Sequence, residues 1–79
     1  MAMARYFFHL IGDQSVTDKE GIEFRDSASV RAYAIASARS MMAAEIMAGQ
    51  LCLSYSIKIE DQTGCLVTVV PFRKALALK

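Results

Sequence analysis

Residues 27–48 contain neither glycine nor proline and are rich in Ala, Met and Ser, which strongly favours a helix in this part of the chain. Asp26 precedes the segment, and an Asp in that place accepts hydrogen bonds from the free N–H groups of a first helical turn. Gly49 follows it, where a residue in the left-handed conformation ends many helices. The segment therefore predicts one helix of about six turns.

The two sides of this predicted helix differ less in polarity than those of a typical surface helix. Its core side is expected to carry Val30, Ala34, Ile35, Ala38, Met41, Met42 and Ile46. The opposite side carries Ala32, Tyr33, Ala36, Ala43 and Met47, and the only charged residues of the segment are Arg31, Arg39 and Glu45. Because a helix side exposed to water normally has more charge, the helix back is a candidate contact surface.

Four further segments have the composition of β-strands. Residues 5–11 (RYFFHLI) are aromatic or apolar without a helical period, residues 21–24 (GIEF) and 55–60 (YSIKIE) alternate, and residues 65–70 (CLVTVV) are rich in β-branched side chains. Turn-forming residues separate them, GDQS after the first segment and DQTG before the last. The order along the chain is therefore strand, strand, helix, strand, strand.

This order predicts an α+β fold in a single domain that spans residues 1–79. The first strand is apolar on both faces and is expected to be central. A right-handed crossover through the helix would place the third strand on the other side of the first. We therefore expect a four-stranded antiparallel sheet with strand order 2-1-3-4 and the helix packed on one face.

The other face of this sheet would remain open. Arg5, Phe7, His9 and Ile11 share one face of the first strand, and Tyr6, Phe8 and Leu10 share the other. In the last strand either Leu66 and Val70 or Val67 and Val69 turn toward the helix, so each register leaves an apolar pair on the open face. The candidate interface residues are Phe7, His9, Ile11, Val67 and Val69 on the sheet, and Ala32, Ala36, Ala43 and Met47 on the helix back.

Composition narrows the class of protein. Hydrophobic residues make up 54% of the chain, so a packed core is expected and some apolar surface should meet another chain. The net charge of +1 comes without a block of like charge, which argues against tight nucleic-acid binding. No apolar stretch is long enough for a membrane span, and the N-terminus does not resemble a signal peptide. The cytoplasm is the expected location, with Cys52 and Cys65 as free thiols.

His9 is the only histidine and the only candidate for a general base near neutral pH. Asp13, Asp18 and Glu20 lie in the next loop, but no motif places a nucleophile or an orienting acid beside His9, so a structural or interface role is expected. The loop does not match a calcium-binding motif, and two cysteines with one histidine cannot form a standard four-ligand zinc site. The sequence thus predicts a protein that is not an enzyme and that uses no metal and no cofactor.

Several short motifs occur in an order that resembles a known family. They are RYFFH at residues 5–9, DKEGIE at 18–23, the Asp26-capped helix, DQTG at 61–64 and VPF at 70–72. Together they are similar to a domain-of-unknown-function family of short cytoplasmic proteins from rhizobia and related alphaproteobacteria. The resemblance covers nearly the whole chain, implies no activity and supplies no catalytic residue. The helix departs from the family pattern, with Ser, Ala and Met where Glu, Arg and Leu are usual.

The expected function is that of a small non-catalytic interaction or regulatory module, which acts as a homodimer or docks on a protein partner. The alternative is a weak nucleic-acid binder that uses Arg5, Lys58 and Arg73 beside the open sheet face. A steep salt dependence of binding would distinguish the alternative from the first hypothesis.

Overall fold

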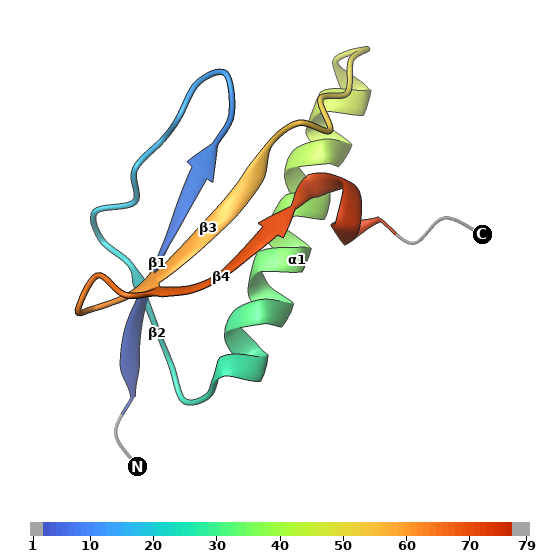
Figure 1. The fold of residues 1–79 in the computed structure, drawn as a ribbon. Helices are drawn as coiled ribbons and strands as arrows, with labels where there is room; N and C mark the ends of the chain where they lie inside the picture. The colour runs from blue at the N-terminus through green and yellow to red at the C-terminus, as the bar shows by residue number, and fades with distance from the viewer. Residues whose placement is uncertain (1–2, 77–79) are drawn as a thin grey trace.

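The computed structural model describes residues 3–76, so the ends of the predicted domain, residues 1–2 and 77–79, lie outside the described part. Its strands are β1 (Ala4–Ile11), β2 (Ile22–Phe24), β3 (Ser56–Asp61) and β4 (Leu66–Pro71). The helix α1 (Ser27–Met47) connects β2 to β3, and a short 3-10 helix, η1 (Phe72–Ala75), follows β4 (Figure 1). All strand pairs are antiparallel and the sheet order is β2-β1-β3-β4, which confirms the expected α+β fold and strand order.

Hydrogen bonds at both ends explain where α1 begins and ends. Oδ1 of Asp26 accepts from the backbone N–H of Ser29 at 2.7 Å, and this bond lowers the pKa of the Asp26 carboxyl. At the other end Gly49 has a φ of 87°, and its N–H donates to the carbonyl of Ile46 at 3.0 Å. The N–H of Gln50 donates to the carbonyl of Glu45 at 2.9 Å, which completes a Schellman motif.

A β-bulge sets which side chains of β4 face the helix. Val70 pairs with Ile57 and Thr68 pairs with Ile59, but Leu66 pairs with Glu60, so Val67 is an extra residue. Val70 and Thr68 therefore share the helix-covered face with the two isoleucines, whereas Val69 and Leu66 lie on the open face. Neither register expected from the sequence is fully correct, because both assumed unbroken alternation along this strand.

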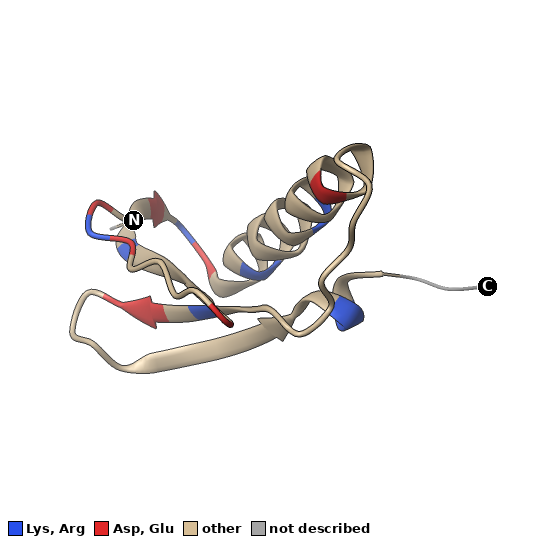
Figure 2. Ribbon diagram, turned by 90° about the horizontal axis from the view of Figure 1, so that it is seen from above, with Lys and Arg blue, Asp and Glu red and all other residues tan. Residues whose placement is uncertain are grey.

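The core lies between α1, the covered face of the sheet and η1. Figure 2 shows α1 over one face of the sheet only. The buried residues are Val30, Ala34, Ala38 and Met42 on α1, Ile57, Ile59 and Val70 on the sheet, and Phe72 and Ala75 on η1. Nε of Arg39 donates to the carbonyl of Ala75 at 2.6 Å, which ties η1 to the helix.

The buried stripe of α1 is narrower than the predicted core side. Its members recur every four residues from Val30 to Met42. Met41 and Ile46 were expected in the core but are 40% and 60% exposed. The reason is that Met41 lies at the margin of the stripe, beside a groove, and that the stripe ends one turn before Ile46. Within residues 3–76, neither helix is long and apolar enough to cross a membrane.

Candidate functional site

His9 is the centre of a hydrogen-bonded network on the open sheet face. Its Nε2 lies 3.0 Å from Oε1 of Glu60, and Oε2 of Glu60 lies 3.3 Å from Nζ of Lys58. On its other side, Nδ1 accepts a hydrogen bond from the backbone N–H of Asp18 at 3.0 Å. A ring nitrogen that accepts cannot carry a proton, so this geometry fits a neutral His9 that donates its Nε2 proton to Glu60. Hydrogen bonds from Lys58 and, to a smaller extent, from His9 lower the pKa of the Glu60 carboxyl.

Asp18 fastens the β1–β2 loop to the edge of β1. Its Oδ2 accepts from the N–H of Phe8, and its Oδ1 accepts from the N–H groups of Glu20 and Gly21, all at 3.1 Å. Burial raises the pKa of the Asp18 carboxyl, but the hydrogen bonds from these backbone donors outweigh burial and hold the pKa below its usual value. Because β2 pairs with β1 only as far as Tyr6, the carboxylate takes the place of a strand partner at Phe8.

Gly21 is needed at the end of this loop. Its φ is +72°, and an added Cβ would lie 2.9 Å from the carbonyl oxygen of Tyr6.

The three acidic residues of the β1–β2 loop that the sequence suggested as neighbours of His9 lie in different places. Asp18 reaches the ring through its backbone, Glu20 lines a groove described below, and Asp13 lines a different hollow beside Glu45 and Tyr55.

The charged side chains of the open sheet face have partners within the chain. Nη2 of Arg5 lies 3.9 Å from Oε1 of Glu23, and its Nη1 donates to the carbonyl of Glu20 at 2.7 Å. Lys58 and Glu60 form the ion pair described above. The face is therefore close to neutral, and its exposed apolar side chains are Ile11, Leu66 and Val69.

The candidate interface residues occupy two separate surfaces. Phe7, His9, Ile11 and Val69 lie together on the open sheet face, with Phe7 and His9 half-buried, and Val67 lies at the bulge beside them. The helix back, away from the sheet, carries the exposed Ala32, Ala36, Ala43 and Met47.

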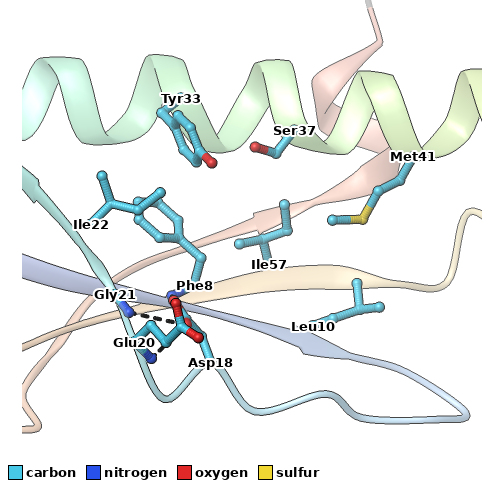
Figure 3. A pocket seen from close by; sticks show the side chains of 10 residues that line it. All are labelled: Phe8, Leu10, Asp18, Glu20, Gly21, Ile22, Tyr33, Ser37, Met41 and Ile57. Atoms are coloured by element: carbon cyan, nitrogen blue, oxygen red, sulfur yellow. Dashed lines mark hydrogen bonds between the residues drawn. The ribbon is translucent and has the colours of Figure 1, made fainter.

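A groove between α1 and the β1–β2 loop was missed by sequence reasoning (Figure 3). We call it the α1–loop groove, and its volume is about 340 Å³. It is lined by Tyr33, Ser37 and Met41 of α1, Phe8, Leu10 and Ile57 of the sheet, and Asp18, Glu20, Gly21 and Ile22 of the loop and β2. A second hollow of about 460 Å³ continues from it past Val16, Thr17 and Lys19.

One sequence signal pointed to this groove. Tyr33, Ser37 and Met41 recur every four residues, so they form a second stripe beside the buried one on α1. The sequence pattern predicts Met41 in the core and Tyr33 on the helix back, which divides this stripe between two surfaces. In the structure both side chains are 40% exposed and both line the groove.

Comparison with models of known protein families gives a match over most of the chain. A family model described as a domain of unknown function (DUF6894) matches residues 5–73. No curated protein and no solved structure matches the chain. The matched range runs from β1 into η1. It therefore includes all of α1, and all of the sheet except Ala4, the first residue of β1.

Proposed function

The chain belongs to the DUF6894 family of domains of unknown function, and we propose that it is a non-catalytic interaction module that pairs with a second copy of itself through the open sheet face. The observation that carries this proposal is the internal pairing of the charges on that face. Arg5 has its partner in Glu23, and Lys58 has its partner in Glu60.

Internal pairing makes the face suitable for burial. A charge that is covered without a partner costs several kcal/mol, roughly, whereas these charges keep their partners when the face is covered. A nearly neutral face also does not repel its own copy. The exposed fractions of Ile11, Leu66 and Val69 are 41%, 58% and 42%, so closing the face would remove apolar surface from water. A closed two-fold dimer is the commonest arrangement that achieves this.

The same pairing weakens the nucleic-acid alternative. Phosphate binding requires cations that are free to replace the counterions of the nucleic acid. Arg5 is bonded to the Glu20 carbonyl and paired with Glu23, and Lys58 is paired with Glu60. Arg73 lies on η1 rather than on a strand of the sheet. These positions do not make a basic stripe.

The non-catalytic part of the proposal rests on His9. Both of its ring nitrogens are engaged, Nδ1 by the Asp18 N–H and Nε2 by Glu60, so neither is free to take a proton from a substrate. Two unbridged cysteines fit a reducing compartment, which supports a cytoplasmic location. The motif resemblance supports a bacterial source among rhizobia and related alphaproteobacteria.

Sedimentation equilibrium at micromolar concentration tests the dimer. We expect a species of twice 8.7 kDa for the unmodified chain and dissociation for Val69→Asp. Val16→Asp is the matched control, because Val16 is 60% exposed on the β1–β2 loop, away from the open face, and this variant should remain a dimer. A single 8.7 kDa species at every concentration would refute the proposal.

The nucleic-acid alternative is tested separately by titrating the protein with random DNA and RNA at several salt concentrations. We expect no binding in the micromolar range. Micromolar binding with a steep salt slope, lost in Arg5→Gln or Lys58→Gln, would favour the alternative over the homodimer proposal.

A further inference from the structure

We propose that the α1–loop groove binds an organic ammonium cation that carries an apolar group. This site is separate from the open sheet face, because its floor is formed by side chains of the helix-covered face, among them Phe8, Leu10 and Ile57. The proposal therefore stands or falls independently of the homodimer.

The apolar part of the ligand is indicated by the side chains that the groove leaves open. Ile22 lies at the end of the groove near Tyr33 and Met41 lies at the end near Leu10, and they are 37% and 40% exposed (Figure 3). Exposed apolar side chains in a hollow favour an apolar occupant, because it releases the water that covers them. The volume of about 340 Å³ is at the lower end of the range for small-molecule sites.

The positive end of the ligand is indicated by the charges of the lining. Asp18 and Glu20 are acidic, and the lining contains no Lys or Arg. Asp18 remains ionised at neutral pH, because its backbone donors hold its pKa below the usual value. The oxygens of Asp18 already accept hydrogen bonds from three N–H groups, so Asp18 contributes negative charge rather than a further hydrogen bond. The side chain of Glu20 is exposed and is able to move toward a ligand.

Aromatic rings in the lining add to the attraction for a cation. Phe8 and Tyr33 both line the groove, and their ring centroids are 5.0 Å apart. The face of an aromatic ring attracts an ammonium group through its quadrupole. The hydroxyls of Tyr33 and Ser37 are further hydrogen-bond acceptors on the α1 side. An anionic ligand in the α1–loop groove would meet two carboxylates in the lining, whereas Lys19 lines only the adjoining hollow.

Three probes with the same phenethyl body test the ligand class: phenethylammonium, phenethyl alcohol and hydrocinnamate. They are titrated separately into the isotope-labelled chain and followed by amide NMR. We expect phenethylammonium to shift the amide signals of Gly21, Ser37 and Met41 and to bind about tenfold tighter than hydrocinnamate, the factor that an exposed cation–π contact together with one carboxylate can supply. Equal binding of all three probes, or no binding of phenethylammonium, would overturn the proposal.

Two charge-neutralising variants test the location. Glu20→Gln should weaken phenethylammonium binding several-fold and leave phenethyl alcohol binding unchanged. Asp13→Asn is the matched control, because it removes one negative charge from the same loop outside the lining and should leave both affinities unchanged. Both residues are exposed, so both variants should fold. If phenethylammonium binds equally well to Glu20→Gln, the site is not the α1–loop groove.

Discussion

The backbone N–H of Asp18 donates to Nδ1 of His9 at 3.0 Å, so a loop residue determines which nitrogen of the ring carries the proton. We expect nitrogen NMR of the imidazole at neutral pH to show the tautomer protonated at Nε2. A neutral ring protonated at Nδ1 would contradict this hydrogen bond.

Asp18→Asn should destabilise the domain at neutral pH. The variant keeps the side-chain shape but places an NH₂ group against backbone N–H donors. We expect the free energy of unfolding to fall by about 1 kcal/mol, which is at the low end for a lost hydrogen bond to a charged group because water reaches the site. Chemical denaturation at pH 7 measures the difference.

The pH dependence of this difference follows from the lowered pKa of Asp18. A carboxyl whose pKa is lower in the folded state stabilises the fold above its unfolded pKa, and this contribution is lost as the pH falls through the folded value. The two proteins should therefore approach equal stability in strongly acidic solution. A gap that widens with acidity would show that the carboxylate does not stabilise the loop.

Two methionines of α1 provide a matched test of the core. Met42 is 1% exposed and Met47 is 88% exposed. Met42→Asp should unfold the domain, because a buried carboxylate without a partner costs several kcal/mol, roughly the whole stability of a small domain. Met47→Asp should leave the thermal midpoint within a few degrees of the original. Circular dichroism melts of both variants decide the matter, and an unchanged midpoint for Met42→Asp would mean that the buried stripe is assigned wrongly.

The two thiols should be free and unequal in reactivity. Cys65 is exposed immediately before β4, whereas Cys52 is half-buried with its Sγ 3.0 Å from Oγ of Ser54. In the folded, non-reduced protein a thiol reagent should label Cys65 before Cys52, and both should react after unfolding. Failure to label either thiol in the unfolded monomer would contradict the fold, because it would require a disulfide.

Local signals were sufficient to predict the helix and the order of the strands along the chain. The ends of α1 depend on Asp26 and Gly49, whose conformational preferences are nearly independent of the rest of the fold. Alternation in β3 correctly separated Ile57 and Ile59 from Lys58, because strand side chains point to opposite faces in turn. These features require information from only a few neighbouring residues.

The parts that could not be predicted depend on contacts between distant residues. The bulge at Val67 shifts the pairing of β4 by one residue, and the alternation of the sequence carries no sign of it. Met41 has the composition of a core residue, and only the path of the β1–β2 loop decides that a groove opens beside it. The network around His9 joins residues as far apart as His9 and Glu60, which no local pattern places together.

The Asp18 carboxylate takes the place of a strand partner at Phe8, and as a result the β1–β2 loop has two parts that differ in their tolerance of insertions. The base of the loop, Asp18 to Gly21, has to keep its length, because one side chain must reach three backbone donors at once. The tip at Asp13, Gln14 and Ser15 is exposed and lies outside this set of bonds. Insertions such as an epitope tag or a fluorophore-binding peptide belong at the tip, and circular permutants of this domain are best opened there.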